Sequence, residues 1–502
     1  MLLTSARNKK WILLLVVLLS CSYLIILTTS NRENVFFSGD GGVKSLVVKQ
    51  VGAGKGFKFL HLDQPVWVQD IWSAGFFPFR KPFVYPSSAG YLFSFPPLYQ
   101  IANAVLYRQW GFRAFYLLPF LSALLLWLSF ASLLLRLGLG SGRTALLLAM
   151  LVFGTPLTVY GAIYWEHMTA VLFLFGGVWM ITDPRPGIVG GMLAGLFCGV
   201  AVWLRPEALI MDFLYALAVL ALFSRRRYVA YGAFIISLGI PIVGFLAFNK
   251  LVYGSLLGVH SYQVLQEHSF AFKIAKAIFE CLLINWTGFI YFPFVALLLP
   301  AIYRVWRGLW SPERPVLMLL LVAGCFCILA SLMMPNSGGR QWGARYLLPV
   351  LPVLLVAGGL VLQGLPLEWK RRPGWMRGVL VAGIGYCLLL NGVVGGFSFM
   401  RSNADRVKPA YDFAAQQEEG VILVNSENIP MELASLFDKR YFFLTPTDSS
   451  LRRLLPLLKQ RGVKDCLYIS EDYRNPGFNN ALNSDTSLLR KGNYYFARYM
   501  IP

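Results

Sequence analysis

Charged residues are scarce in this sequence, and acidic residues are scarcer than basic ones. Asp, Glu, Lys and Arg make up 14% of the 502 residues, whereas a soluble globular protein carries roughly 25%. Hydrophobic residues make up 57%, and they fall in runs of about 20, the length that crosses a bilayer as a helix. This composition excludes an ordinary soluble protein and predicts a polytopic membrane protein.

The shortage of acids leaves a formal net charge of +21. In a soluble chain this charge would suggest a nucleic-acid partner. Here the basic residues lie in short loops between the apolar runs, which is the pattern of cytoplasmic loops in membrane proteins. We therefore expect membrane lipid as a partner and no nucleic acid.

Several common site motifs are missing. The seven cysteines lie mostly inside apolar runs and form no CxxC pair, which argues against a disulfide framework and a zinc site. We find no repeat between the two halves and no clearly paired broken helices, features that many transporters have. These absences weigh mildly against a transporter.

The apolar runs predict about eleven transmembrane helices within residues 1–400. The first span runs from about Trp11 to Thr28, with a cytoplasmic N-terminus, and residues 29–112 form a long first external loop. Within that loop Leu98–Tyr107 is expected to form a helix on the membrane or dipping into it, and the eighth span is placed at about Trp286–Tyr303. The expected location is the cell (inner) membrane, with multiple passes.

The composition changes after Met400. Residues 401–502 carry 14 Lys and Arg against 12 Asp and Glu. Apolar runs at 421–424, 441–444 and 466–469 predict strands, and 430–437 and 450–461 predict helices. We expect a small extracytoplasmic α/β domain with a parallel sheet. Its strand ends carry no glycine-rich phosphate loop, so we interpret it as an accessory domain.

Asp40 is a lone acid just beyond the first span, within Ser38-Gly39-Asp40-Gly41-Gly42. Glycines let the backbone turn sharply and let a substrate approach closely. A carboxylate there can act as a base, but Asp and Gly are equally common in surface turns. The residues alone leave both interpretations open.

Other ionisable residues are expected on the same face of the membrane as Asp40. Glu166 and His167 begin the fourth span, where His167 can bind phosphate, a metal or a sugar, or can be structural. Arg205 and Glu207 flank Pro206 and can form a mutual salt bridge. The last external loop carries Arg340 and Arg345, although arginine is disfavoured in short external loops.

Arg340 and Arg345 have alternative explanations. Their planar donor forks match phosphate oxygens, and Lys44 could assist them. They could also pair with acids such as Glu166 or with anionic lipid head groups. A carboxylate base combined with an anion clamp suits group transfer from a phosphate-activated donor, because the acceptor hydroxyl must lose a proton and the leaving phosphate carries charge.

Short motifs along residues 8–400 resemble those of the GT-C glycosyltransferases that use polyprenyl-phosphate sugars, a family that includes protein mannosyltransferases, aminoarabinose transferases and rhizobial lipopolysaccharide sugar transferases. The motifs are Ser38–Gly42, Pro96–Tyr99, Trp165–His167, Trp203–Glu207, Asn249–Gly254 and Gly343–Pro349. In the family an acid of the first external loop follows the first span, and a second acid follows the third span. Asp40 and Glu166 match these two positions.

The resemblance implies an inverting transfer of one sugar to a glycan, lipid or protein acceptor, with Asp40 as the base. Glu166 and His167 would orient a substrate or hold a divalent metal (Mg or Mn). Many relatives carry an acid near the second carboxylate where this chain has His167, which leaves metal use open. The remaining residues expected to bind substrate are Lys44, Arg205, Glu207, Arg340, Arg345 and Tyr346.

Two other functions stay open. A transporter or flippase of a lipid-linked glycan would use the same basic cavity without chemistry. A non-catalytic membrane assembly protein would use its C-terminal domain to recruit partners.

Overall fold

The computed structural model describes residues 6–183, 187–221, 228–259, 270–294, 314–334, 341–363, 374–472 and 489–501. By its internal contacts the chain divides into two compact units. Unit 1 comprises Met1–Leu27 and Tyr116–Ser398, and unit 2 comprises Thr28–Phe115 and Phe399–Pro502.

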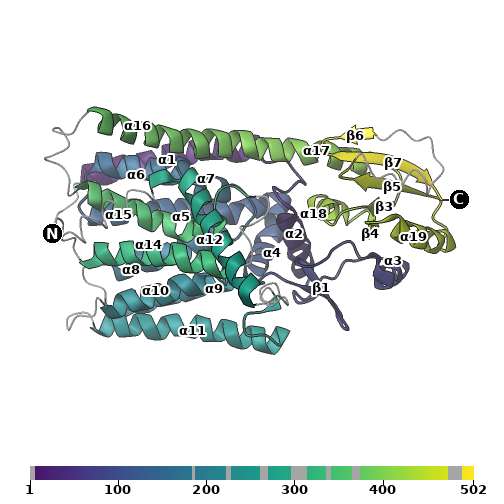
Figure 1. Ribbon diagram of the computed structural model, residues 1–502, viewed down its shortest axis with the longest axis horizontal. Coiled ribbons are helices and arrows are strands. Elements are labelled where there is room, and N and C mark those ends of the chain that lie inside the picture. The colour runs from purple at the N-terminus through teal and green to yellow at the C-terminus, as the bar shows by residue number, and fades with distance from the viewer. Residues whose placement is uncertain are drawn as a thin grey trace. The chain divides into compact units, whose positions relative to one another are not determined.

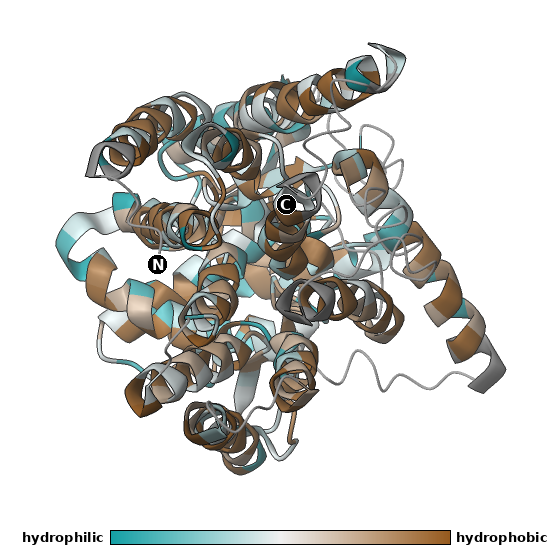
Figure 2. Cartoon of the chain, turned by 90° about the vertical axis from the view of Figure 1, so that its left-hand side faces the viewer, coloured by the Kyte–Doolittle hydropathy of each residue, from teal (hydrophilic) through white to brown (hydrophobic). Residues whose placement is uncertain are grey.

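Unit 1 is built of apolar helices (Figures 1 and 2). Its elements are α1 (Ala6–Ser30), α5 (Ala114–Arg136), α6 (Ser141–Phe153), α7 (Leu157–Tyr160), α8 (His167–Ile181), α9 (Ile188–Leu204), α10 (Ala208–Ala221), α11 (Tyr228–Tyr253), α12 (Phe270–Tyr291), α14 (Arg314–Met333), the 3₁₀-helix η5 (Arg345–Val350), α15 (Leu351–Gln363), α16 (Gly374–Leu388) and the π-helix η7 (Leu389–Phe399). Among the described residues, five helical segments are long and apolar enough to cross a membrane, and further apolar helices are shorter.

Glycines allow α9 to pack closely on α11. A Cβ atom added at Gly191 would lie 2.1 Å from the Ala230 carbonyl oxygen, and one at Gly195 would lie 2.2 Å from Ser237 Oγ. Small residues at four-residue spacing are the usual means by which apolar helices approach backbone to backbone in membranes. The spacing therefore fixes which face of α9 meets α11, and the end of α9 carries Arg205.

Unit 2 combines two segments of the chain, one before and one after residues 116–398. Its elements are α2 (Gly39–Gly52), α3 (Val66–Ile71), the π-turn η1 (Trp72–Phe76), β1 (Val84–Ser87), β2 (Gly90–Phe93), α4 (Leu98–Trp110), η2 (Gly111–Arg113), α17 (Met400–Gln416), β3 (Val421–Val424), α18 (Asn428–Glu432), η8 (Ala434–Leu436), β4 (Tyr441–Leu444), α19 (Asp448–Gln460), β5 (Asp465–Ser470), β6 (Leu489–Lys491) and β7 (Tyr494–Met500). The larger sheet has the order β4-β3-β5-β7-β6.

The strands predicted at 421–424 and 441–444 are confirmed, and so is their parallel pairing, with Val424 opposite Leu444. The third predicted strand is present as β5, parallel to β3. The sequence analysis missed β6 and β7, which extend the sheet with antiparallel pairs. α12 runs from Phe270 to Tyr291 and so begins before the eighth span expected at about Trp286–Tyr303, of which residues 295–303 lie outside the described residues.

Residues 28–115 and the C-terminal segment share one hydrophobic core. Trp72 Nε1 donates a hydrogen bond of 2.9 Å to the Phe442 carbonyl oxygen. The rings of Phe79 and Phe437 stack with centroids 5.3 Å apart. The expected domain boundary at residue 400 follows the order of the chain, whereas unit 2 joins residues 28–115 to residues 399–502. The functions expected for the two domains stay predictions.

Candidate functional site

In unit 1 three buried charged side chains meet at helix ends. Glu166 precedes α8, Arg205 caps the C-terminal end of α9, and Glu207 precedes α10. Arg205 Nη1 lies 3.0 Å from Glu166 Oε1, and Arg205 Nε donates to Glu207 Oε1 at 2.6 Å. One guanidinium thus binds two carboxylates that are almost fully buried.

The electrostatics of this triad keep Arg205 charged. Burial acts to lower the pKa of Arg205, but the Glu207 and Glu166 carboxylates outweigh it and raise that pKa above its usual value. The salt bridge that the sequence analysis weighed for Arg205 and Glu207 is present. Arg205 also reaches Glu166, a contact that the sequence did not indicate, so its first role in the structure is to neutralise two acids.

Arg345 begins η5 and stacks on aromatic rings. Its guanidinium carbon lies 4.9 Å from the ring centroid of Tyr346 and 5.8 Å from that of Trp165. Its Nη2 donates to Tyr346 Oη at 2.9 Å. The two rings and this hydrogen bond restrain the guanidinium. Its planar set of N–H donors matches the oxygens of a phosphate.

His167 lies in an aromatic cluster beside the triad. Its ring centroid lies 5.2 Å from that of Tyr160 and 5.1 Å from that of Trp165. The side chain is buried. Burial, with Glu166 nearby, raises the pKa of Tyr164 in the same turn. The structure thus brings together Glu166, His167, Arg205, Glu207, Arg345 and Tyr346, six of the residues that the sequence predicted as functional.

A pair that the sequence analysis missed anchors the segment carrying Arg345. Trp342 Nε1 donates to Asn391 Oδ1 at 3.1 Å, and Asn391 Nδ2 donates to the carbonyl oxygens of Gly154 and Tyr291. A Cβ atom added at Gly395 would lie 2.6 Å from the Trp342 ring. Asn391 was visible in the sequence as a lone polar residue in an apolar run, a usual signal of a buried hydrogen-bonding role.

Asp40 and Lys44 belong to unit 2, on α2. Asp40 lies in the first turn of this helix, partly exposed, and makes no hydrogen bond or ion pair with the residues the structure describes. Lys44 is 1% exposed, and its Nζ lies 4.3 Å from the ring centroid of Phe95. Burial over an aromatic face gives Lys44 a packing role within unit 2.

The expectation of a glycine-rich turn around Asp40 is wrong, because Gly39–Gly52 is helical. A Cβ atom added at Gly42 would lie 1.7 Å from the Met431 carbonyl oxygen, and one at Gly39 would lie 2.9 Å from Met431 Cβ. These two glycines let α2 approach α18. Packing, rather than close access for a substrate, accounts for them.

Two predictions find no support in the described residues. Arg340 lies outside the residues that the structure describes. No group of three or more His, Cys, Asp or Glu side chains suited to a metal occurs among the described residues. Because Arg205 already binds Glu166 and Glu207, these two acids do not form a ready donor set for a divalent cation.

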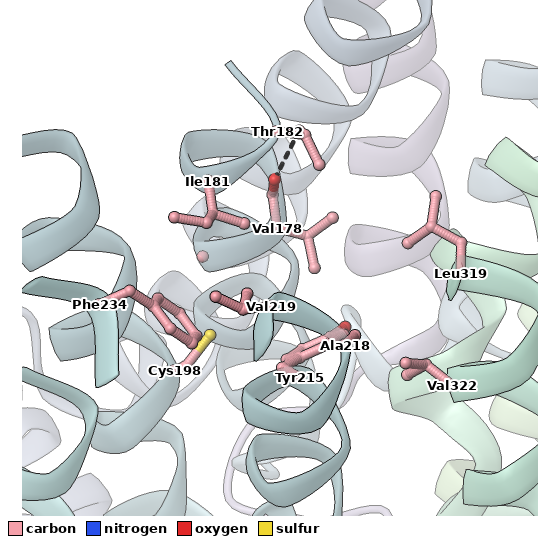
Figure 3. Close-up of a pocket in the computed structure, with 11 residues that line it drawn as sticks. Val178, Ile181, Thr182, Cys198, Tyr215, Ala218, Val219, Phe234, Leu319 and Val322 are labelled. Carbon is pink, nitrogen blue, oxygen red and sulfur yellow. Dashed lines mark hydrogen bonds between the residues drawn. The ribbon is translucent and has the colours of Figure 1, made fainter. Parts of the chain in front are cut away.

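A small cavity in unit 1 is too small for a sugar or a lipid. It has a volume of about 60 Å³ and is lined by residues of α8–α11 and α14, among them Cys198, Tyr215 and Phe234 (Figure 3). On α8 the lining begins at Gly177, ten residues beyond His167, or about 15 Å along the helix. The cavity is therefore separate from the charged cluster.

No family model and no curated protein matches the sequence. The fold does match solved structures. ArnT from Cupriavidus metallidurans, bound to undecaprenyl phosphate, aligns with a TM-score of 0.56 and 14% identity over 98% of each chain. The oligosaccharyltransferase of Archaeoglobus fulgidus, tethered to an acceptor peptide, aligns with a TM-score of 0.50 and 11% identity over 91% of this chain and 69% of that chain.

These matches define the class of the protein as a polytopic membrane protein with the GT-C fold. The resemblance seen in the sequence is thereby confirmed for the fold, and it extends beyond residue 400 to nearly the whole chain.

Proposed function

We propose that this protein is an integral-membrane glycosyltransferase that moves a sugar from a polyprenyl-phosphate donor to an acceptor on the extracytoplasmic face. The observation that carries the proposal is the match over 98% of both chains to ArnT, a protein whose structure contains undecaprenyl phosphate. The arginine and aromatic cluster of unit 1 supports it, because this chemistry suits a lipid phosphate.

The proposed reaction has one displacement step. The acceptor hydroxyl gives its proton to the Asp40 carboxylate while its oxygen attacks the anomeric carbon. The bond from that carbon to the phosphate oxygen breaks, and the electron pair leaves with the polyprenyl phosphate. Attack opposite to the leaving group inverts the configuration. The absence of a described partner for Asp40 is compatible with a base role.

Arg345 would hold the leaving phosphate. Its guanidinium, restrained by Tyr346 and Trp165, would present N–H donors to the phosphate and stabilise its developing negative charge. Glu166 and Glu207 keep Arg205 in place, and this triad supports the turn that carries Trp165, on which Arg345 stacks. His167 would then lie close enough to the site to contact the sugar.

The proposal is tested in membranes given radiolabelled polyprenyl-phosphate sugars. We expect label to pass to an acceptor and added undecaprenyl phosphate to inhibit as the product. Because Arg345 supplies positive charge, we expect EDTA to change the rate less than about twofold, a small effect compared with the 10²-fold or larger losses typical when a charge-stabilising group is removed. No transfer from any donor, together with faster movement of the lipid across the bilayer, would contradict the proposal and favour the transporter.

A further inference from the structure

Unit 2 contains a polar pocket that the proposed reaction does not use. It lies between the segment leading into α3 and the turn before β4. The side chains that line it include Asp63, Gln64, Gln69, Asp438, Lys439 and Tyr441. Its volume is about 500 Å³, within the range of about 300–1,000 Å³ that is usual for small-ligand sites.

The walls of this pocket are held across two distant segments of the chain. Gln64 Nε2 donates to the Phe437 carbonyl oxygen at 2.7 Å, and Gln69 Nε2 donates to the Gln64 carbonyl oxygen at 2.8 Å. The Tyr441 ring packs edge-on against Trp67 with centroids 5.2 Å apart. The pocket is therefore preformed, which lowers the entropic cost of binding.

One polar group in the wall lacks a donor. Gln64 is 9% exposed, and its Oε1 accepts no hydrogen bond from any residue in the described ranges. A buried acceptor left in this state costs about 1–3 kcal/mol. Because Gln64 Nε2 is bound to the Phe437 carbonyl oxygen, the amide keeps this orientation and the wall carries this cost.

Each of the two acids that line the pocket is paired with a lysine that does not line it. Asp438 Oδ2 pairs with Lys49 Nζ at 2.6 Å, and Asp63 Oδ1 pairs with Lys55. Each acid thus has a cation on one oxygen, which reduces its attraction for a metal ion, while its second oxygen can still accept an O–H donor. Lys439 and Gln69 add donors to the same wall.

We propose that this pocket binds a saccharide unit. A sugar offers several O–H donors in a small volume, which matches the carboxylate and amide acceptors of Asp63, Asp438 and Gln69. The ring of Tyr441, which lines the pocket, offers an apolar edge for its C–H groups. Resting on the proposed function, this site selects a glycan from the three acceptor classes, because neither a lipid tail nor a peptide backbone needs so many acceptors.

The test is binding to the full-length chain in nanodiscs, measured by saturation-transfer NMR. The probes are glucose, galactose, mannose, rhamnose, N-acetylglucosamine, glucuronic acid and the disaccharides of these sugars. We expect saturation transfer to at least one probe. Gln69→Trp, which fills the pocket from an exposed position, and the double variant Asp63→Asn with Asp438→Asn should each reduce it at least fivefold.

Asp70→Asn is the matched control, since Asp70 lies on α3, is half-exposed, pairs with Arg461 and does not line the pocket. Its signal should equal that of the native chain. Absence of transfer to every probe, or equal transfer in the native and Gln69→Trp chains, would overturn the proposal. Sugar binding without any glycosyl transfer would support the saccharide site and contradict the proposed glycosyltransferase activity. The two proposals can therefore be rejected independently.

Discussion

Arg345 is the side chain on which the proposed phosphate binding depends most. Its stacking on Trp165 and Tyr346 suits a planar guanidinium and not a point-like ammonium. Arg345→Lys keeps the positive charge but loses the planar set of N–H donors. We expect the KM for the polyprenyl-phosphate donor to rise about tenfold, or about 1.4 kcal/mol, in steady-state transfer assays.

Arg143→Lys is the control for this change, because Arg143 is exposed near the start of α6 and should show the native KM. An unchanged donor KM in Arg345→Lys would remove Arg345 from the donor site.

A separate prediction concerns the contribution of Arg205 to the stability of the protein. Arg205→Met leaves the Glu166 and Glu207 carboxylates buried without their cation, and breaking a buried pair by removing one partner costs about 3–5 kcal/mol. We expect a clearly lower melting temperature for the purified chain. Arg461→Met removes a half-exposed pair with Asp70, worth about 0–1 kcal/mol, and should melt like the native chain. Equal melting of both variants would show that the triad is not structural.

At the scale of elements, the packing of α2 on α18 explains the glycines around Asp40. Gly42→Ala would place a methyl group 1.7 Å from the Met431 carbonyl oxygen, and overpacking of this kind costs about 1–3 kcal/mol. In an isolated helix the same change is favourable by roughly 0.5–1 kcal/mol. Gly42→Ala therefore lowers the stability of the protein if α2 packs closely on α18, and raises it if α2 is exposed.

The comparison is with Gly56→Ala, where an added Cβ meets nothing within 4 Å. We expect thermal unfolding of the purified chain to begin at a lower temperature in Gly42→Ala and to be unchanged in Gly56→Ala. Higher stability in Gly42→Ala would mean that α2 and α18 do not pack in this way.

The elements differ in how well the sequence predicted them. The strand at 421–424 was predicted with its observed ends because a short buried strand is a continuous apolar run between polar residues. The start of α12 was missed because Lys273, Lys276 and Glu280 conceal an amphipathic helix. The salt bridge of Arg205 with Glu207 could be predicted from their positions around Pro206. Its contact with Glu166, 39 residues away, could not, because it depends on how α8 and α9 pack.

At the scale of the whole molecule, the sequence indicated the membrane class and the GT-C fold, but not the composition of unit 2. Long-range pairing of 28–115 with 399–502 leaves no periodic signal in either segment. This pairing predicts that the first external loop depends on the C-terminal segment. Deleting residues 401–502 removes the Phe442 and Phe437 carbonyl acceptors of Trp72 and Gln64 and uncovers their shared core.

We expect trypsin to cleave the truncated chain at Lys55, Lys58 and Arg80 much faster than the native chain, measured by limited proteolysis in detergent. Cleavage by thermolysin at apolar sites in 28–115 should rise in parallel. Equal protection in the two chains would show that residues 28–115 fold without the C-terminal segment.

The central claim is that the protein transfers a sugar and that Asp40 takes the acceptor proton. The most direct measurement is the single-turnover rate of transfer from a radiolabelled polyprenyl-phosphate sugar, with purified native, Asp40→Asn and Asp70→Asn chains. A positioned base contributes about 10²–10⁴-fold, so we predict a loss of that size in Asp40→Asn, with native folding by gel filtration, and no loss in Asp70→Asn. Transfer at the native rate in Asp40→Asn would contradict the assignment of the base.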